Sequence, residues 1–484
     1  MRQSISFVLD GKIQTIEFSE QFRPTTTVLN YLRINPVHKG VKEGCAEGDC
    51  GACTVVIAEL THDNKISYKA WDSCLVFLPM IHGKQLITVE NLSQFNDAEK
   101  VLHPVQKAMV ESNGSQCGYC TPGIIMSMFS LYKNERNPAK ESIEDALTGN
   151  LCRCTGYKPI IEATAKACAQ QSADQFTISE KHIVELLQQI KNQSKSIEIN
   201  TSQQKYYQPK TKKEALELRS KMQNSVLLSG GTDIALRVTK RHELLEEIID
   251  LSSIDELKKY TITDNQVRFG AGMNLEDVKK IAKTELPALY ETLSVFGSRQ
   301  IRSLATLGGN IGSGSPIGDT LPTLMAYNAE IKLQSLTGER SMNMNNYILG
   351  YRKTECQPDE IITEIIIPKP SSKTIVKFYK ISKRKDLDIS TVSACFSLTL
   401  DNNNILAIKL AYGGMAAITK RATNAEQYLT GKFWDRTTVE QSMELIAKEF
   451  TPISDARSGA EFRTIAAKNL LLKFWSETIK NENS

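Results

Sequence analysis

The sequence has no apolar run long enough to cross a membrane and no marked excess of charge of either sign. A membrane-spanning helix needs about 20 mostly apolar residues in a row, and the 484-residue chain contains no such run. Lysine and arginine number 59 against 55 aspartates and glutamates, and the net charge of +4 makes no case for nucleic-acid binding. The first residues, MRQSISFVLDGK, lack the apolar run and cleavage site of a signal peptide. We therefore expect a cytoplasmic protein that contacts neither membrane nor nucleic acid.

Two more absences narrow the choice of fold. The chain has no internal repeats, and no G-x-G-x-x-G motif follows a β-type run, which excludes a Rossmann dinucleotide site. Apolar residues make up 41% of the chain and charged residues 24%, proportions that are ordinary for globular proteins with sizeable cores. A chain of this length is expected to form about three or four domains.

The pattern of apolar residues changes along the chain and predicts an α+β multidomain protein. A hairpin around an Asp-Gly turn opens a small β-grasp-like domain, and capped helical segments then form an all-helical domain. A stretch rich in Gln, Ser and Lys predicts an exposed linker, in which KHIVELLQQI is a candidate short helix. Alternating helices and strands follow, before a closing α+β domain. The predicted ranges are 1–92 (β-grasp-like), 97–170 (helical), 171–205 (linker), 206–370 (α/β or α+β) and 371–484 (closing domain).

Eleven cysteines need an explanation, and nine of them lie before residue 170. Stable disulfides are rare in a reducing compartment, so a dense group of cysteines indicates metal binding or catalysis. Two later cysteines, Cys356 and Cys395, stand alone, and we expect both to be small buried apolar side chains.

The first group has the spacing C-x4-C-x2-C at Cys45, Cys50 and Cys53, with Cys74 twenty-one positions later. Plant-type 2Fe–2S ferredoxins use this arrangement. The loop GCAEGDCGAC is rich in glycine, which lets the backbone curl around sulfur and turn its N–H groups toward a negatively charged cluster. A structural zinc site, which prefers two pairs of closely spaced ligands, matches this spacing less well.

The second group consists of Cys117 and Cys120 in QCGYCTPG and Cys152 and Cys154 in NLCRCTGY. On the pattern alone, a four-cysteine zinc site remains open. Two details favour an iron–sulfur cluster. The C-x-C spacing is tighter than that of zinc knuckles, and the pairs lie at predicted helix ends, where positive dipole ends would face a negatively charged cluster.

Two glycine-rich loops, at residues 227–234 (LLSGGTDI) and 303–322 (SLATLGGNIGSGSPIGDTLP), follow apolar segments. Such loops expose backbone N–H groups and permit close approach by a pyrophosphate. On the residues alone, ordinary turns explain the two loops equally well.

The motifs GCAEGDCGACTV, QCGYCTPG and NLCRCTGYKPI, in this order, resemble the iron–sulfur portion of the molybdenum hydroxylase family, to which the xanthine dehydrogenases belong. The resemblance implies two 2Fe–2S clusters. The left-over Cys168 is expected to be a packed thiol. The implied ligands are Cys45, Cys50, Cys53 and Cys74 for one cluster, and Cys117, Cys120, Cys152 and Cys154 for the other.

The resemblance extends through both glycine-rich loops, which are similar to the FAD segments of the family's flavin domain, of the vanillyl-alcohol-oxidase type. Tyr351 and Arg352, in LGYRKTE, resemble the segment near the flavin's nicotinamide face, although a surface turn explains them equally well. The implied FAD contacts are Leu227, Leu228, Ser229, Gly230, Gly231, Thr232, Asp233, Ile234, Phe296, Thr306, Leu307, Gly308, Gly309, Asn310, Asp319, Ile362 and Lys380, of which Asp319 would hold a polar part of the cofactor.

The family also carries a molybdenum cofactor in a large domain, for which this chain has no room after its flavin region. The resemblance therefore implies the small subunit of a two-chain bacterial xanthine dehydrogenase, with a separate large subunit that binds molybdopterin and the purine. Electrons would pass through two clusters to FAD and then to NAD⁺, without a catalytic acid or base in this chain. A dimer of small–large pairs is expected. The alternatives are an aldehyde, carbon monoxide or N-heterocycle substrate, O₂ as acceptor, and a zinc-stabilised binding module.

Overall fold

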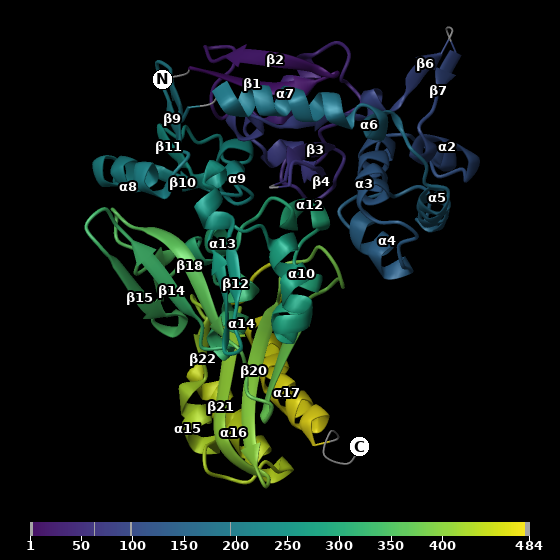
Figure 1. Ribbon diagram of the computed structural model, residues 1–484. Helices are drawn as coiled ribbons and strands as arrows, with labels where there is room; N and C mark the ends of the chain where they lie inside the picture. Colours follow the sequence, from purple (N-terminus) through teal and green to yellow (C-terminus); the bar gives the residue numbers. More distant parts are fainter. Residues whose placement is uncertain (1–2, 62, 97–98, 194, 480–484) are drawn as a thin grey trace. The chain divides into compact units, whose positions relative to one another are not determined.

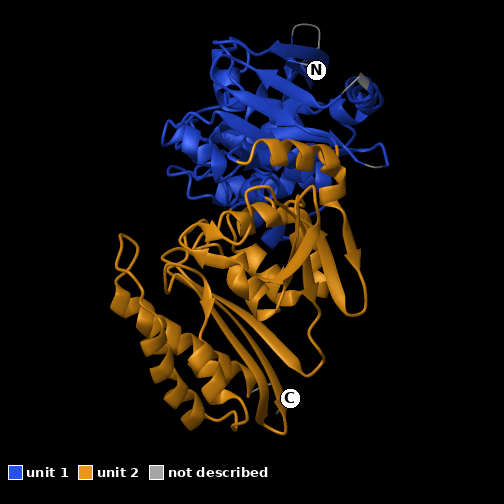
Figure 2. Cartoon of the chain, turned by 90° about the vertical axis from the view of Figure 1, so that its left-hand side faces the viewer, with its two compact units in different colours: residues 1–210, 224–253, 298–305 blue, residues 211–223, 254–297, 306–484 orange. Residues whose placement is uncertain are grey.

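The computed structural model describes residues 3–61, 63–96, 99–193 and 195–479. It is a mixed α+β structure that divides into two compact units, drawn in two colours in Figure 2. Unit 1 comprises Met1–Lys210, Asn224–Ser253 and Ser298–Ala305, and unit 2 comprises Thr211–Gln223, Ile254–Gly297 and Thr306–Ser484. Each unit is described by itself.

Unit 1 opens with a five-stranded sheet of order β2-β1-β5-β3-β4 (Figure 1). Its first two strands form the expected antiparallel hairpin, in which Asp10 and Gly11 both adopt a positive φ, as the two central residues of a type I′ turn do. Helix α1 buries Val28, Leu29 and Leu32 in the core beneath this sheet. The bounds are β1 Ser4–Leu9, β2 Lys12–Glu17, α1 Val28–Ile34, β3 Thr54–Leu60, β4 Ile66–Asp72 and β5 Gln85–Ile87.

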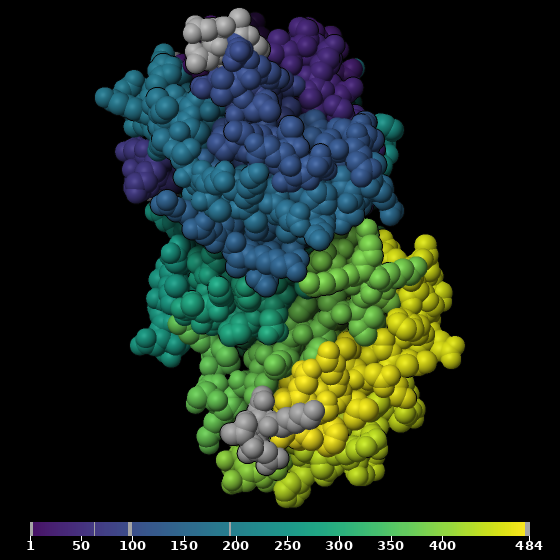
Figure 3. All heavy atoms as spheres, turned by 90° about the vertical axis from the view of Figure 1, so that its right-hand side faces the viewer, coloured from purple at the N-terminus to yellow at the C-terminus, as the bar shows by residue number. Residues whose placement is uncertain are grey.

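A group of helices follows, coloured blue in Figure 3, where it forms a continuous part of the surface of unit 1. Its centre is α3, which begins with Pro122 in its first turn and is buried without interruption from Gly123 to Tyr132. A helix that is apolar on every side must lie inside a domain. A two-stranded ribbon precedes the helices. The bounds are β6 Gln94–Asn96, β7 Glu99–Val101, α2 Pro104–Glu111, α3 Thr121–Asn134, α4 Lys140–Leu147 and α5 Lys158–Ala169.

Residues 171–205 differ from the exposed linker that their composition predicts. They form α6 (Gln175–Ile178), α7 (Glu180–Gln193) and β8 (Ile197–Asn200). Helix α7 places Ile183, Leu187 and Ile190 on one face, where they pack against Val8 of the first sheet. The many Gln, Glu and Lys residues occupy its other faces. The polar composition of residues 171–205 as a whole therefore hid the apolar face of an amphipathic helix.

A second sheet of unit 1, of order β10-β11-β9-β8, shares a core with the first. Its strands β10, β11 and β9 run parallel, and Tyr206 Oη donates a hydrogen bond of 2.6 Å to buried Asp250. The loop after β10 leads into α9. The bounds are β9 Lys205–Gln208, β10 Val226–Leu228, α9 Ile234–Thr239, β11 Glu247–Asp250 and α12 Arg299–Arg302.

Unit 2 contains a five-stranded sheet of order β12-β13-β18-β14-β15, a four-stranded sheet of order β19-β20-β21-β22 and a small ribbon, β16-β17. Helices α15, α16 and α17 share one core with the four-stranded sheet. The strands are β12 Tyr260–Ile262, β13 Gln266–Gly270, β14 Glu330–Gln334, β15 Glu339–Asn343, β16 Ile348–Gly350, β17 Lys353–Thr354, β18 Ile361–Pro368, β19 Thr374–Ile381, β20 Val392–Asp401, β21 Asn404–Gly413 and β22 Lys420–Arg421. The helices are α8 Lys212–Lys221, α10 Leu275–Glu285, α11 Pro287–Ser294, α13 Leu307–Gly312, α14 Thr320–Ala326, α15 Thr423–Leu429, α16 Arg436–Glu449 and α17 Ala460–Thr478.

A buried ionic network ties α6 to the helical part of unit 1. Asp174 caps α6 by accepting a hydrogen bond from Thr177 N, and its other contacts are Lys133 Nζ at 2.8 Å and His103 Nε2 at 3.1 Å. Burial alone would raise the pKa of Asp174, but the hydrogen bonds from His103 and Lys133 outweigh it and hold the pKa below its usual range. Asp174 is therefore a carboxylate that stabilises the fold.

Replacing Asp174 with Asn should lower the free energy of unfolding by about 3 kcal/mol at neutral pH, because Lys133 keeps its charge in a buried place without a carboxylate. The folded pKa of Asp174 lies below the unfolded one, so the wild-type advantage is complete above about pH 4 and is lost as the pH falls further. Urea unfolding followed by circular dichroism at several pH values measures both effects.

The matched control is Asp63→Asn. Asp63 is exposed and pairs with Lys65 at the surface, so its replacement should leave unfolding unchanged. An equal loss of stability for Asp174→Asn at neutral and at acidic pH would contradict the ionic role assigned to Asp174.

Candidate functional site

The first cysteine group is assembled by the hairpin of β3 and β4. In the register of these strands Thr54 pairs with Asp72, so Cys53, just before β3, lies beside the turn that follows β4 and carries Cys74. The two Sγ atoms are 3.3 Å apart. The strand register, rather than any local spacing, therefore brings the distant fourth cysteine to the loop.

The loop that carries Cys45 and Cys50 is coiled by residues with positive φ, which are Ala46, Gly48 and Gly51. This coiling turns the backbone N–H groups of Glu47 and Asp49 toward Cys45 Sγ, at 3.4 and 3.3 Å. The loop thus provides hydrogen-bond donors for negative charge on sulfur.

Each pair in this group contains one thiol that donates to the other. A hydrogen bond from Cys50, aided by the N–H groups of Glu47 and Asp49, lowers the pKa of Cys45 to about 5. The same hydrogen bond and burial raise the pKa of Cys50, and the contact with Cys74 likewise raises that of Cys53. Thiolates are the form that binds metals, so Cys45 is already in the ligand state at neutral pH.

The second cysteine group lies at the start of α3 and in the turn between α4 and α5. Cys120 is the N-cap of α3, as the sequence predicted for a helix end, whereas Cys117, Cys152 and Cys154 lie in loops. Cys154 Sγ lies 3.5 Å from Cys117 Sγ, and Cys120 makes a side-chain hydrogen bond with Cys152. Cys117 and Cys154 are exposed and Cys152 is buried, so one side of this group faces solvent.

The thiols of both groups stand in pairs, which are Cys45 with Cys50, Cys53 with Cys74, Cys117 with Cys154, and Cys120 with Cys152. Two thiolates on one tetrahedral metal ion lie about 3.8 Å apart, close to the distances found here. Among the residues that the structure describes, no three Cys, His, Asp or Glu side chains gather around a single point. In a 2Fe–2S cluster each iron takes two protein sulfurs, so four thiols in two pairs are the donor set that such a cluster needs.

The three remaining cysteines are not part of these pairs. Cys168 in α5 and Cys395 in β20 are fully buried, as expected of packed thiols. Cys356 is only partly buried, with Sγ 3.7 Å from Glu360 O, and its surroundings raise its pKa to about 11, chiefly by desolvation.

The first predicted FAD segment, residues 227–234, lies in unit 1. It consists of the end of β10, a turn in which Gly231 has φ +79°, and the start of α9. A side-chain carbon on Gly230 would lie 2.1 Å from Leu304 O, so this glycine is required by the packing of the turn itself.

The second predicted FAD segment, Thr306–Asn310, lies in unit 2, where it caps and begins α13. Thr306 Oγ1 accepts a hydrogen bond from Gly309 N. Gly308 packs so closely that an added carbon would lie 2.7 Å from Ala271 O, whereas Gly309 is exposed and only Thr306 Oγ1 lies within 4 Å of such a carbon. The loop surface at Gly309 is thus open to a ligand, which fits the close approach expected of a cofactor phosphate.

Two further predicted FAD contacts, Asp319 and Lys380, form a buried ion pair of 2.9 Å. Ser390 Oγ donates to the other oxygen of Asp319 at 2.6 Å, and Lys380 Nζ also donates to Val295 O, next to Phe296. Sequence reasoning missed Ser390, which lies in a segment without a recognisable motif. Ile362 in β18 lies near Gly312, at the end of the same glycine-rich helix α13.

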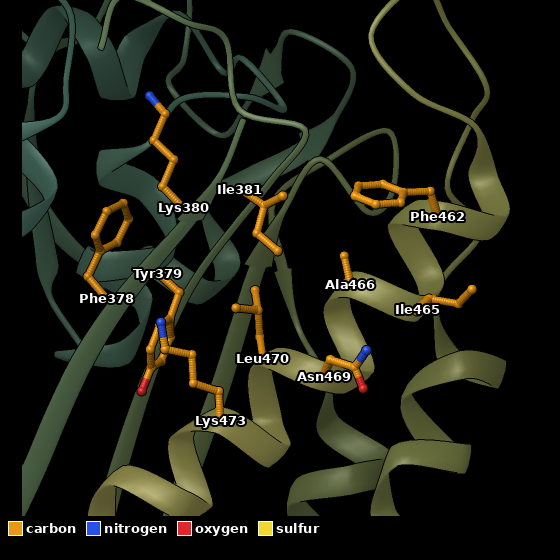
Figure 4. Close-up of a pocket in the computed structure, with 10 residues that line it drawn as sticks. All are labelled: Phe378, Tyr379, Lys380, Ile381, Phe462, Ile465, Ala466, Asn469, Leu470 and Lys473. Atoms are coloured by element: carbon orange, nitrogen blue, oxygen red, sulfur yellow. The ribbon is translucent and has the colours of Figure 1, made fainter. Parts of the chain in front are cut away.

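A pocket of about 480 Å³ lies between β19 and α17 in unit 2 (Figure 4). Its lining is largely apolar and includes Phe462, Ile465 and Leu470. Lys380 is the only predicted FAD contact that borders it, and Figure 4 shows this side chain pointing away from α17. Lys380 thus borders the pocket and also pairs with Asp319.

Tyr351 and Arg352 form the turn of the β16–β17 ribbon, where both are exposed and Arg352 has φ +51°. The turn lies against Gly314, since a carbon added to that glycine would be 3.3 Å from Arg352 Cα. The pair is thus a surface turn that packs on the glycine-rich segment of unit 2.

Known proteins share this order of sites. Residues 88–165 match the family described as "[2Fe-2S] binding domain". Residues 182–370 match the family described as "FAD binding domain in molybdopterin dehydrogenase", and residues 377–478 match the family described as "CO dehydrogenase flavoprotein C-terminal domain". Xanthine dehydrogenase of Emericella nidulans is 31% identical over 98% of this chain. The chain belongs to the molybdenum hydroxylase family. It corresponds to the iron–sulfur and FAD portion of that family and spans 39% of the length of this relative.

Other known proteins are similar to this chain over different extents. Xanthine dehydrogenase/oxidase of Gallus gallus is 31% identical over 97% of this chain, which spans 39% of it. A solved carbon monoxide dehydrogenase chain from Hydrogenophaga pseudoflava has a TM-score of 0.53 and 25% identity, and covers 55% of this chain and 93% of its own. Quinoline 2-oxidoreductase from Pseudomonas putida 86, at 21% identity and a TM-score of 0.53, covers 57% of this chain and 96% of its own and shares the fold.

The family matches bear unequally on the two cysteine groups. The match over residues 88–165 contains the second group and supports a 2Fe–2S cluster, and the match over residues 182–370 supports FAD. The first group lies before both ranges, so its cluster remains a prediction from spacing and geometry. Within the described part of the chain, no helix combines the length and apolar character needed to span a bilayer.

The cysteine assignment predicts that Cys50→Ser and Cys117→Ser each remove one of two 2Fe–2S signals in electron paramagnetic resonance spectra of the reduced protein. The other signal and the FAD should stay, because the two groups have no thiol in common. Cys356→Ser is the matched control and should keep both signals. If either group's variant retained both signals unchanged, its ligand assignment would be wrong.

The open surface at Gly309 predicts that Gly309→Leu lowers the FAD content of the purified protein, because the new side chain would occupy the ligand's space. Fluorescence of flavin released by heat measures this content. Gly338→Leu, in the turn between β14 and β15, is the control, since nothing lies within 4 Å of an added carbon there. A full complement of FAD in Gly309→Leu would exclude this loop from the flavin site.

Proposed function

We propose that this chain is the electron-transfer subunit of a xanthine dehydrogenase. Hypoxanthine and xanthine are oxidised to urate at a molybdenum cofactor in a separate large subunit. The electrons pass through two 2Fe–2S clusters of this chain to FAD, and NAD⁺ is the final acceptor. The working assembly is a dimer of small–large pairs. The observation that carries the proposal is the arrangement of eight cysteines as four thiol pairs in one compact unit.

The extent of the sequence similarity favours xanthine as the substrate. The xanthine dehydrogenases of Emericella nidulans and Gallus gallus are similar over 98% and 97% of this chain, which includes both cysteine groups and both glycine-rich loops. The carbon monoxide dehydrogenase structure covers only 55% of the chain. The order of two cysteine groups followed by a flavin region in one chain also favours the xanthine-type arrangement.

The residues of this chain have binding and orienting roles in the proposed function. The thiol pairs hold the irons, and the N–H groups of Glu47 and Asp49 stabilise the charge on Cys45. Lys380 and Asp319 hold each other in a fixed orientation beside the glycine-rich segment. Bound FAD supplies a group that exchanges single electrons with clusters and a hydride with a nicotinamide. None of these side chains needs to act as a general acid or base.

A second candidate is the same electron-transfer role in another molybdenum hydroxylase. The likeness to carbon monoxide dehydrogenase and to quinoline 2-oxidoreductase supports it. In that case the large subunit would bind an aldehyde, carbon monoxide or an N-heterocycle. O₂ in place of NAD⁺ is a further variant of the same role.

The cofactor content tests the electron-transfer role. The purified chain should be brown and contain about four iron, four acid-labile sulfide and one FAD. Metal analysis, sulfide assay and flavin fluorescence measure these amounts. A colourless protein that contains zinc would contradict the proposal and support a zinc-stabilised binding module.

Anaerobic mixing separates the candidate donors and acceptors. NADH should bleach the flavin absorbance of the chain, because an acceptor site for NAD⁺ also works in reverse. In the complex with the large subunit, xanthine should reduce the clusters and NAD⁺ should reoxidise them. Reduction by an aldehyde, carbon monoxide or an N-heterocycle but not by xanthine would support the second candidate, and reoxidation by O₂ alone would exclude NAD⁺.

A further inference from the structure

The side chain of Asn150 connects the two cysteine groups. It lies in the turn between α4 and Cys152 and is 2% exposed. Its Nδ2 donates to Gly51 O at 3.0 Å and to Thr54 Oγ1 at 3.2 Å, on either side of Cys53. One buried amide therefore holds the first cysteine loop against the segment that enters the second group.

The residue after Asn150 completes this junction. The N–H of Leu151 donates a hydrogen bond of 2.9 Å to Cys50 O. Cys50 is a predicted ligand of the first cluster, and Cys152, bonded directly to Leu151, is a predicted ligand of the second. A single hydrogen bond thus closes a bonded route from Cys50 Sγ through the backbone of Leu151 to Cys152 Sγ.

Close backbone approach makes the junction possible. A side-chain carbon on Gly51 would lie 2.2 Å from Gly149 O, and one on Gly123 would lie 2.1 Å from Gly51 O. Only residues without side chains let the first loop, the turn before Asn150 and the first turn of α3 touch in this way. The contact is therefore specified by the sequence at three separate places.

The orientation of the amide is fixed from its other side. Asn150 Oδ1 accepts hydrogen bonds from Ser127 Oγ at 2.6 Å and from Gln300 Nε2 at 3.0 Å, and all three residues are buried. With donors at its oxygen and acceptors at its nitrogen, the side chain has one favourable orientation. The amide of Asn150 thus makes all four of its hydrogen bonds, which holds this side chain rigidly.

We propose that Asn150 is a positioning residue for electron transfer between the two clusters, because it holds Cys50 and Cys152 at the ends of the Leu151 hydrogen bond. The inference rests on the proposed function. In this step one electron leaves the reduced cluster and reduces the other, and no bond breaks and no proton moves. Electrons tunnel better through bonded atoms than across a gap. The transfer therefore slows when Cys50 O and the N–H of Leu151 are no longer held within hydrogen-bond distance.

The test is Asn150→Asp, which keeps the shape of the side chain, removes both N–H donors and places a carboxylate against Gly51 O. In the fully reduced wild-type protein, two 2Fe–2S signals should show a mutual spin–spin splitting in electron paramagnetic resonance spectra. The variant should keep both clusters but lose or shift this splitting. After pulse reduction, the electron should also redistribute between its clusters more slowly than in the wild type.

Two further variants keep the test decisive. Ser127→Ala retains Asn150 but removes a donor to Oδ1, so it should change the splitting and the rate in the same direction by less. Asn134→Ala is the matched control, because Asn134 Nδ2 ties α3 to Tyr68 O at the end of the helix opposite Cys120, and it should change neither.

The outcomes separate the two proposals. A wild-type chain with fewer than two cluster signals would overturn the proposed function itself. Two normal signals in the wild type, with an unchanged splitting and an unchanged rate in Asn150→Asp and Ser127→Ala, would overturn the role of Asn150 alone. Lowered stability in these variants without either change would show that Asn150 serves the fold only.

Discussion

Two sulfur atoms must be held a few ångströms apart before they can share a metal ion, and the elements of unit 1 that carry cysteines meet this constraint. The β3–β4 register brings Cys74 to Cys53, and the start of α3 meets the turn that precedes α5. Each group takes its thiols from two distant segments. The β3–β4 hairpin and the helical core are therefore required to bring the thiols of each group together.

Four thiols held close together raise an electrostatic problem, since neighbouring thiolates repel each other. The structure resolves it by pairing a thiol that donates with one that accepts, so that the pKa of Cys45 falls to about 5 while that of Cys50 rises. The buried carboxyl of Asp72, near Cys53, follows the same rule. Desolvation, and then the charge of Cys45, raise its pKa to about 8.

The sequence predicted best what depends on neighbouring residues. The spacing of Cys45, Cys50 and Cys53 is local, and so is the helix end predicted next to Cys120, which the structure confirms as the N-cap of α3. The linker prediction failed for residues 171–205, because α7 hides three apolar side chains among polar ones. The β-grasp description, which comes from the residue pattern, and the vanillyl-alcohol-oxidase description, which comes from the resemblance, both remain predictions.

Contacts between distant segments were beyond the sequence. No spacing rule connects Asn150 to Gly51, because the contact depends on how the helical group packs on the first cysteine loop. The same is true of Ser390, which reaches Asp319 only because the segment between β19 and β20 returns to the start of α14. The motifs contain both Asn150 and Gly51 but do not show that they meet, and the resemblance indicated Asp319 but not Ser390.

The flavin-side residues obey the same constraint as the thiols, since charge is buried there only in compensated form. Lys380 and Asp319 are both buried, and each also contacts a neutral group, Val295 O for the lysine and Ser390 Oγ for the aspartate. A buried ion pair adds little stability by itself, but the loss of one partner leaves an uncompensated charge. The resemblance assigned these two residues to the cofactor separately. Their pairing means that neither can be changed without altering the other, so any effect on flavin binding belongs to the pair.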